Sequence, residues 1–295
     1  MDVKRIVMLI QEFKHHFFLE LSNDYPETEI QSFFNILIEF KLHLSRIQLA
    51  LEHNFELDRD DLYFMENALL KLKNQIPVQY IVGETAFYGL MFKVDKNVLI
   101  PRPETEELAE WIVQSLPIGR QDHKKSESLK ILDIGTGSGC IAISLAKNLP
   151  NAQVSALDIS EEALNVAKNN AEFNQVTIDF IQADILTLEK LEGDFDVIVS
   201  NPPYVRESEK DLMQQNVLSN EPHIALFVEN ENPLLFYDKI TELAKNHLTK
   251  NGVLYFEINQ YLGMETVDLL KTKGFKNIEL KKDIYGVDRM VKCSF

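Results

Sequence analysis

Cysteine is scarce in this sequence. Cys140 and Cys293 are its two cysteines, 153 positions apart and each in apolar surroundings. Such a spacing provides neither a disulfide framework nor the closely spaced ligands of a zinc site. The adjacent His15 and His16 would point about 100° apart on a helix, so they cannot share a metal ion. We therefore expect small buried thiols and no metal centre.

Basic residues are outnumbered as well. There are 30 Lys and Arg against 46 Asp and Glu, a net charge of -16, and both the first 75 residues and the remainder are acidic. This balance argues against a module that binds nucleic acid non-specifically. Charges interrupt every apolar run, and Met1–Arg5 begins an amphipathic pattern rather than a secretory signal. We expect a cytoplasmic, monomeric protein with no membrane segment and no direct contact with nucleic acid.

Helical periodicity fills the first quarter of the chain. Apolar residues recur at helical spacing over 3–21, over 30–51, and from an N-cap at Asp58 to Leu72. They predict a small all-helical N-terminal domain over residues 1–75. Because this segment carries no catalytic constellation, we interpret it as a substrate-docking domain. The alternative is a cap that only stabilises the chain, since helical bundles serve both purposes.

The pattern then changes to short β-type segments. Residues 76–100, with Gly83 and Tyr88-Gly89, predict a β-hairpin linker between two domains. An amphipathic helix is expected from Glu104 through Leu116, and a polar surface loop over 117–128.

Strands and helices alternate through the last domain, residues 101–295. This alternation predicts an α/β fold with a mostly parallel, Rossmann-like sheet covered by helices on both faces. The short final connection predicts an antiparallel last strand. The expected strands are 129–134, 153–158, 177–182, 195–200, 253–258, 276–282 and 288–294, and the expected helices are 140–149, 160–174, 233–248 and 264–273.

A glycine-rich loop follows the first of these strands. Glycines let the backbone turn tightly and approach a ligand at the start of a helix. The Gly-x-Gly-x-Gly spacing differs from that of dinucleotide-binding proteins, and the aspartate before it suits the ammonium group of a methionine moiety better than a pyrophosphate. We therefore assign to a cofactor site the residues Asp133, Gly135, Thr136, Gly137, Ser138 and Gly139.

Two further aspartates follow the next two strands. Asp158 ends the second strand, where a carboxylate can accept both ribose hydroxyls of a nucleoside. Asp184 follows the third strand and is placed to meet an adenine amino group, with Ile185 packing on the ring. Each aspartate could instead cap a helix, as Asp158-Ile159-Ser160 would. Taken together, these residues indicate S-adenosylmethionine as the cofactor.

The tetrapeptide Asn201-Pro202-Pro203-Tyr204 follows the buried strand 195–200. Its prolines remove two backbone donors, so the carbonyls of Asn201 and Pro202 remain as acceptors in a stiff loop. Asn201 adds a side-chain oxygen and Tyr204 an aromatic face. This group suits a planar NH2 held by its hydrogens, although Asn-Pro is also common in ordinary turns. We assign the four residues to catalysis and substrate binding, and Asn201 to the cofactor site too.

With the glycine loop, Asp158 and the tetrapeptide in place, the chain resembles the class I S-adenosylmethionine-dependent methyltransferases. More narrowly, it resembles the HemK/PrmC family, the glutamine methyltransferases of peptide chain release factors. The narrower resemblance rests on residues 77–108, on Glu221-Pro222 with Ala225-Leu226, and on Gly286-Val287-Asp288-Arg289. One departure is Asn259, at a position where the family usually has glycine, which leaves the role of Gln260 open.

The resemblance implies a seven-stranded methyltransferase domain and a specific reaction. A methyl group passes from S-adenosylmethionine, leaving S-adenosylhomocysteine, to the glutamine amide nitrogen of the Gly-Gly-Gln motif of a release factor, which tunes translation termination. It implies that the Asn201 side chain and the Pro202 carbonyl accept hydrogen bonds from the substrate NH2, and that Tyr204 packs on the amide plane. It also implies a substrate-binding role for Arg102 and Glu106. No metal and no essential histidine are expected.

Three rival functions share parts of this pattern. A DNA adenine-N6 methyltransferase uses the same tetrapeptide, but the acidic charge and the lack of a basic recognition domain argue against it. A glutamine methyltransferase of a ribosomal protein would have identical catalytic loops. A non-catalytic binding protein would not need the glycine loop, Asp158 and Asn201 together.

Overall fold

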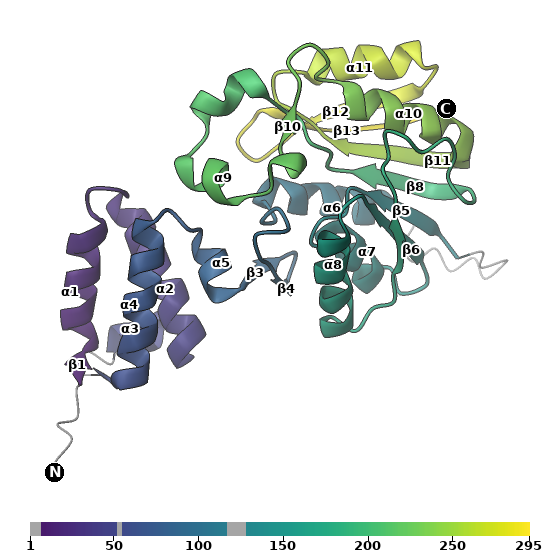
Figure 1. Ribbon diagram of the computed structural model, residues 1–295. Helices are drawn as coiled ribbons and strands as arrows, with labels where there is room; N and C mark the ends of the chain where they lie inside the picture. Colours follow the sequence, from purple (N-terminus) through teal and green to yellow (C-terminus); the bar gives the residue numbers. More distant parts are fainter. Residues whose placement is uncertain (1–6, 52–54, 117–127) are drawn as a thin grey trace. The chain divides into compact units, whose positions relative to one another are not determined.

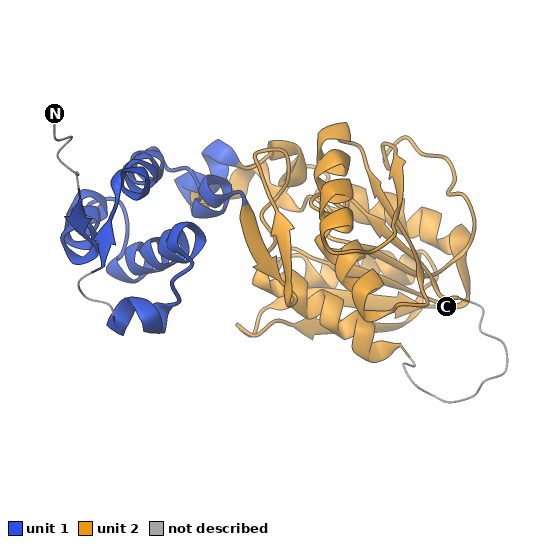
Figure 2. Cartoon of the chain, turned by 90° about the horizontal axis from the view of Figure 1, so that it is seen from below, with its two compact units in different colours: residues 1–83, 214–220 blue, residues 84–213, 221–295 orange. Residues whose placement is uncertain are grey.

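The computed structural model describes residues 7–51, 55–116 and 128–295 (Figure 1). They form two compact units, one of residues 1–83 with 214–220 and one of residues 84–213 with 221–295 (Figure 2). The units therefore divide the chain at Gly83 rather than at residue 75. The linker expected over 76–100 is not a separate body, since it is shared between the two units.

The first unit is a bundle of short helices. Tyr25 donates its hydroxyl to the carbonyl of Leu72 at 2.8 Å, and the carboxylate of Asp58 accepts from the N–H groups of Asp60 and Asp61, as expected for an N-cap. Phenylalanine and leucine side chains of α1, α2 and α4 fill its core. The elements are β1 (Met8–Leu9), α1 (Ile10–Leu21), α2 (Glu27–Leu42), α3 (Arg46–Leu51), β2 (Glu56–Leu57), α4 (Arg59–Lys73), α5 (Val78–Val82) and α9 (Gln215–Asn220).

Two predictions for this part of the chain are wrong in detail. The helix expected over 30–51 is interrupted, because His43 adopts a left-handed φ of 56° and ends α2. Residues 78–82, expected as part of a hairpin, form α5, which Gly83 ends at a φ of 75°. Both ends of α5 are buried in the helical core, and tertiary packing of this kind overrides a weak β pattern.

The second unit contains a seven-stranded sheet, which confirms the predicted fold class. The strand order is β12-β13-β11-β8-β5-β6-β7, and β13 is antiparallel to both of its neighbours. The last strand is antiparallel, as the short connection predicted. The strands are β5 (Lys130–Ile134), β6 (Gln153–Asp158), β7 (Asp179–Gln182), β8 (Phe195–Ser200), β11 (Leu248–Glu257), β12 (Lys276–Lys282) and β13 (Asp288–Ser294). A separate two-stranded hairpin, β3 (Glu84–Phe87) and β4 (Leu90–Lys93), precedes them.

Helices cover both faces of this sheet (Figure 1). One face packs against α6 (Pro103–Ser115), α7 (Cys140–Asn148) and α8 (Glu161–Phe173), and the other against α10 (Leu235–His247) and α11 (Gly263–Thr272). Ile131 and Val197 face the first layer, whereas their neighbours Leu132 and Ile198 face the second. This alternation explains why the strands read as continuous apolar runs. Across the described residues, no helix is both long and apolar enough to cross a membrane.

A connection between β8 and α10 carries short elements that the sequence did not predict. They are β9 (Val205–Arg206), η1 (Glu207–Leu212), α9, η2 (His223–Ala225) and β10 (Phe227–Val228). The strands β9 and β10 pair in parallel. The polar loop expected over 117–128 lies almost entirely outside the described residues, which resume at residue 128.

Candidate active site

The candidate site lies where the parallel strands end. Ile134 pairs with Leu157 on one side and with Ser200 on the other, so the carboxyl ends of β5, β6 and β8 are level. The Ser200 hydroxyl donates to the Ile134 carbonyl at 2.7 Å and ties β8 to β5. From β5 the sheet continues to β6 and β7 on one side and to β8 and β11 on the other. Open α/β sheets bind ligands at this kind of switch point.

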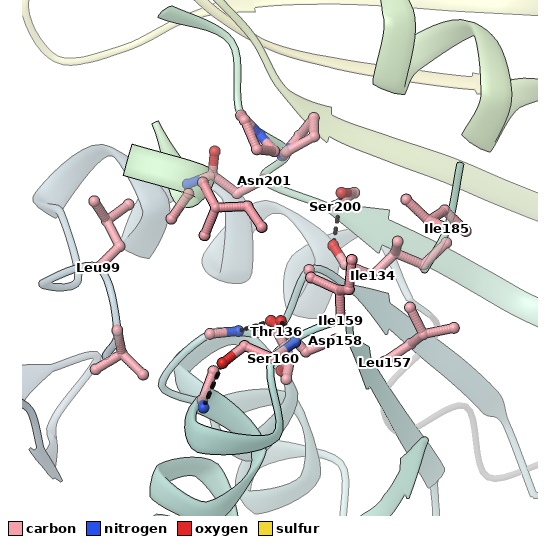
Figure 3. A pocket seen from close by; sticks show the side chains of 18 of the residues that line it. Leu99, Ile134, Thr136, Leu157, Asp158, Ile159, Ser160, Ile185, Ser200 and Asn201 are labelled. Carbon is pink, nitrogen blue, oxygen red and sulfur yellow. Dashed lines mark hydrogen bonds between the residues drawn. The ribbon is translucent and has the colours of Figure 1, made fainter. Parts of the chain in front are cut away.

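A pocket opens there (Figure 3). Asn201 lies across it from Thr136 and Asp158 (Figure 3). Apolar side chains form much of the remaining wall. The lining residues include Leu99, Pro101, Arg102, Thr105, Ile134, Gly135, Thr136, Gly137, Ser138, Cys140, Leu157, Asp158, Ser160, Asp184, Ile185, Asn201, Pro202, Pro203, Pro222, Ile224, Phe236 and Ile240.

The glycine loop forms one wall through its backbone. Gly135, Gly137 and Gly139 have φ values of 73°, 54° and 82°, a region that side chains disfavour. The N–H groups of Gly135 and Thr136 donate to the Leu157 carbonyl at 2.8 and 3.0 Å, which joins the loop to β6. The loop leads directly into α7, whose N-cap is Gly139.

Asp133 is buried behind this loop. Its carboxylate accepts from the Thr136 hydroxyl at 2.6 Å and from the Ala142 N–H at 3.3 Å. Asp133 Oδ1 is buried and has no hydrogen-bond partner among the described residues. Burial raises the pKa of Asp133 to about 7, against the opposing effect of the Thr136 and Ala142 hydrogen bonds. Asp133 is not among the described residues that line the pocket, so its geometry fits an indirect role, holding the loop.

Asparagine at position 133 should change how stability depends on pH. The carboxyl has a pKa of about 7 in the folded protein, against a usual value of 3.8. Between these values the folded state binds more protons than the unfolded state, so this group lowers stability as pH rises. From about pH 5 to about pH 7, the free energy of unfolding of the wild type should fall by about 2 kcal/mol relative to Asp133→Asn. Urea unfolding of both proteins across this range measures the difference, and parallel curves would contradict it.

Asp158 and Ser160 shape the opposite corner of the loop. Asp158 Oδ2 accepts from the Gly137 N–H at 2.8 Å and Oδ1 from the Ser160 N–H at 3.0 Å. Burial raises the pKa of Asp158, and these backbone hydrogen bonds oppose the rise. Ser160 caps α8 by accepting from the Ala163 N–H. Asp158 thus holds the turn that leads into α8. Each of its oxygens can still accept a further hydrogen bond from a ligand in the pocket.

Asp184 and Ile185 lie on the β7 side of the pocket. Both line it, and Ile185 is buried against Ile134 and Leu157 in the same apolar cluster. Asp184 Oδ1 accepts from the Leu186 N–H at 2.9 Å, which closes a turn after the strand. This corner therefore combines an apolar wall with a carboxylate at its edge.

Three residues of the tetrapeptide line the pocket, and the fourth packs elsewhere. Asn201, Pro202 and Pro203 line the pocket, and the Asn201 Nδ2 donates to the Thr105 hydroxyl at 3.3 Å. Tyr204 is not among the described lining residues. Its hydroxyl instead donates to Glu257 Oε1 at 3.0 Å, and burial beside that carboxylate raises the pKa of Tyr204 well above its usual value. The structure thus gives the Tyr204 hydroxyl an anchoring contact, and the packing of its ring on the substrate amide stays a prediction.

Thr105 and Glu257 were not assigned to the site from sequence. Thr105 lines the pocket from α6, and Glu257 lies at the end of β11, 1% exposed. The Thr105 hydroxyl donates to Glu257 Oε2 at 2.6 Å. Burial raises the pKa of Glu257, while its hydrogen bonds from Thr105 and Tyr204 oppose the rise. A charged residue at the end of a buried strand was the available signal for Glu257, as it was for Asp158.

Arg102 and Glu106, both expected in substrate binding, make different contacts in the structure. Arg102 lines the pocket and pairs with the buried Glu221 at 2.6 Å. Glu106 is not among the described lining residues, and its Oε1 accepts from the Tyr88 N–H at 3.0 Å. Tyr88 sits at a φ of 47° in the turn of the β3–β4 hairpin. Glu106 thus fixes that turn, and its role in substrate binding stays a prediction.

Asn259 holds the end of the tetrapeptide and the segment after it. It is buried, and its Nδ2 donates to the Tyr204 carbonyl at 2.9 Å and to Glu209 Oε2 at 3.0 Å. A glycine could make neither contact. Gln260 is not among the described residues that line the pocket.

The residues of the pocket fit S-adenosylmethionine. Ile134, Leu157 and Ile185 offer an apolar wall for a purine ring, and Asp158 offers a carboxylate for ribose hydroxyls. An ideal Cβ at Gly135 or Gly137 would meet nothing within 4 Å, so open space adjoins the loop backbone. The carboxylate of Asp158, which lines the pocket, would favour the positively charged cofactor.

Comparison with known proteins gives consistent matches along the chain. The model of the PrmC N-terminal domain matches residues 16–83, and the model of the methyltransferase small domain matches residues 120–226. A release factor glutamine methyltransferase of Flavobacterium psychrophilum is 56% identical over 98% of this chain and 100% of its own length. One from Bacteroides thetaiotaomicron is 41% identical over 93% of this chain and 96% of its own.

Solved structures agree on the fold. A methyltransferase from Pyrococcus furiosus superposes with a TM-score of 0.50 at 19% identity, covering 77% of this chain and 96% of its own. The hMettl16 catalytic domain superposes with a TM-score of 0.53 at 15% identity, covering 82% of this chain and 85% of its own. The two relatives at 56% and 41% identity, with the match to the PrmC N-terminal domain, show that the chain belongs to the release factor glutamine methyltransferase family, whose cofactor is S-adenosylmethionine.

Proposed function

We propose that this protein transfers a methyl group from S-adenosylmethionine to the side-chain amide nitrogen of the glutamine in the Gly-Gly-Gln motif of peptide chain release factors. The observation that carries the proposal is the position of Asn201 and Pro202 in the wall of the pocket that the glycine loop also lines. The names of the relatives, release factor glutamine methyltransferase, support the same substrate.

The chemistry required of the protein is mainly orientation. An amide nitrogen is a weak nucleophile because its lone pair is delocalised into the carbonyl. S-adenosylmethionine supplies an electrophilic methyl group on a positively charged sulfur. The Asn201 side-chain oxygen and the Pro202 carbonyl accept hydrogen bonds from the substrate NH2. These two bonds orient its nitrogen toward the methyl group in the pocket. The nitrogen becomes acidic once methylated, so no strong base is needed before transfer.

The cofactor residues have distinct roles in this proposal. Gly135, Thr136 and Gly137 would hold the methionine part with their backbone, Asp158 would accept hydrogen bonds from the ribose hydroxyls, and Asp184 with Ile185 would receive the adenine. Asp133 supports the loop from behind, and Ser138 lines the pocket. Arg102, which lines the pocket, would contribute to substrate binding.

The helical unit would serve as the docking surface for the release factor. Its acidic charge suits a partner with basic patches. A DNA substrate is disfavoured by the same charge, since binding to phosphates requires clustered Lys and Arg. We also propose a cytoplasmic location, where translation takes place.

The test is methyl transfer from labelled S-adenosylmethionine to a purified release factor, beside a variant whose Gly-Gly-Gln glutamine is alanine. We expect label on the first and none on the second. Ribosomal proteins and duplex DNA are offered in parallel. Label on a ribosomal protein alone would retain the glutamine chemistry and overturn the partner, and label on DNA alone would overturn the protein substrate.

A further inference from the structure

A chain of hydrogen bonds runs behind the pocket to Asn201. The Asn201 Nδ2 donates to the Thr105 hydroxyl, and that hydroxyl donates to the Glu257 carboxylate at 2.6 Å. The Tyr204 hydroxyl donates to the other Glu257 oxygen at 3.0 Å. Thr105 and Glu257 are 2% and 1% exposed, so water does not compete for these bonds.

The direction of this chain follows from the atoms available. A threonine hydroxyl has one hydrogen, and the short bond to a carboxylate uses it. The Thr105 oxygen can then only accept from its other neighbour. Asn201 must present its NH2 to Thr105, because its side-chain oxygen would there face a lone pair. The amide oxygen of Asn201 is thereby turned away from Thr105.

This orientation bears on the substrate, because a glutamine NH2 needs acceptors. An asparagine amide has nearly the same shape in its two orientations, so local sterics do not choose between them. With the opposite orientation, the Asn201 NH2 would meet the substrate NH2, donor against donor. The protein therefore needs a buried group that selects one orientation before the substrate arrives.

We propose that Thr105 and Glu257 are positioning residues, which orient the Asn201 amide so that its oxygen receives the substrate NH2. The inference rests on the proposed function, since it assumes a primary amide substrate. Glu257 acts through Thr105, and Tyr204 fixes the carboxylate from its other side. The Glu257 backbone is also held, because its carbonyl accepts from the buried Tyr237 hydroxyl at 3.2 Å.

Thr105→Val removes the hydroxyl and keeps the shape of the side chain. We expect kcat for methylation of a release factor to fall roughly 10- to 100-fold, because the reacting amide is no longer held in one orientation. Affinity for S-adenosylmethionine, measured by calorimetry, should stay within about threefold, since the proposed cofactor contacts come mainly from the glycine loop, Asp158, Asp184 and Ile185. Thr105→Ser restores the hydroxyl and should recover most of the lost activity.

The matched control is Thr241→Val. Thr241 is also fully buried, and its hydroxyl has no hydrogen-bond partner among the described residues. It should leave kcat unchanged. Comparing the melting temperatures of both valine variants separates a loss of stability from a loss of orientation.

Glu257→Gln tests the hydrogen bond between Thr105 and Glu257. It also replaces Thr105→Val as the test if that variant does not fold. One side of the new amide is a donor, so the Thr105 hydrogen can be released toward Asn201. A similar loss of kcat is expected, and the double variant should lie within about threefold of Thr105→Val, because both changes break the same path. Additive losses, or no recovery in Thr105→Ser, would overturn the positioning role.

The wild type in the same assay separates this inference from the function. If the wild type methylates the release factor and Thr105→Val equals it, the positioning role fails and the function stands. If the wild type transfers no methyl group to glutamine, the proposed function fails, and the positioning role fails with it.

Discussion

Replacing Asn201 by alanine is expected to lower kcat for glutamine methylation by roughly 10²- to 10³-fold, the cost of removing one oriented polar group from a catalytic site. Asn201 lines the pocket and is held by Thr105 at 3.3 Å, so its oxygen is in place before substrate binds. Alanine leaves the substrate NH2 with one acceptor fewer and no preferred orientation. Initial rates with labelled S-adenosylmethionine and a release factor measure the loss.

Two further variants sharpen this prediction. Asn201→Asp keeps the shape but lacks the NH2 that pairs with Thr105, and it brings a charge into the pocket, so it should also be impaired. Asn246→Ala removes an exposed asparagine of α10 and should behave as the wild type. Full methyl transfer by either Asn201 variant would contradict the proposed mechanism.

Gly139→Ala should destabilise the protein by about 2 to 4 kcal/mol, through strain and overpacking together. Gly139 has a φ of 82°, where an L side chain is strained. An added Cβ would also lie 2.8 Å from Ile143 Cδ1 and 3.1 Å from the Ala167 Cβ. Both neighbours are buried, in α7 and α8, so neither helix has room to move aside. Urea unfolding measures the loss.

Gly193→Ala separates the two contributions. Gly193 has a φ of 96°, but an added Cβ there meets nothing within 4 Å. It should therefore cost only backbone strain, about 1 to 2 kcal/mol. If both alanine variants lost the same stability, the close approach of α7 and α8 would not be the reason for a glycine at position 139.

Much of the fold could be predicted because it is encoded locally. Strands β6 and β8 begin and end at the expected residues, since each is a short apolar run bounded by polar turn formers. The polar residues at the ends of these strands, Asp158 as the last residue of β6 and Asn201 directly after β8, line one pocket. In a parallel sheet all such ends meet at one edge, so strand order need not be known to group them.

Local pattern failed where packing or local backbone conformation decided the outcome. The apolar residues of 78–82 were read as part of a hairpin, yet they form α5 because both ends are buried in the helical core. Long-range contacts were likewise beyond the reach of local pattern. Tyr204 and Glu106 were assigned to the substrate, which stays a prediction, but their bonds to Glu257 and to the Tyr88 backbone, 53 and 18 positions away, could not be predicted.

The sequence by itself determined the fold class, the cofactor loop and the tetrapeptide, because periodicity, glycine spacing and strand-end polarity act over a few neighbouring residues. Only the tertiary structure decided which groups hold Asn201. Thr105 lies 96 positions before it, and Thr105 and Glu257 are 152 positions apart. Their meeting depends on strand β11 lying next to β8 and on α6 packing over that part of the sheet. Hydrogen bonds between such distant residues leave no periodic trace in the sequence, since they are set by strand order and register.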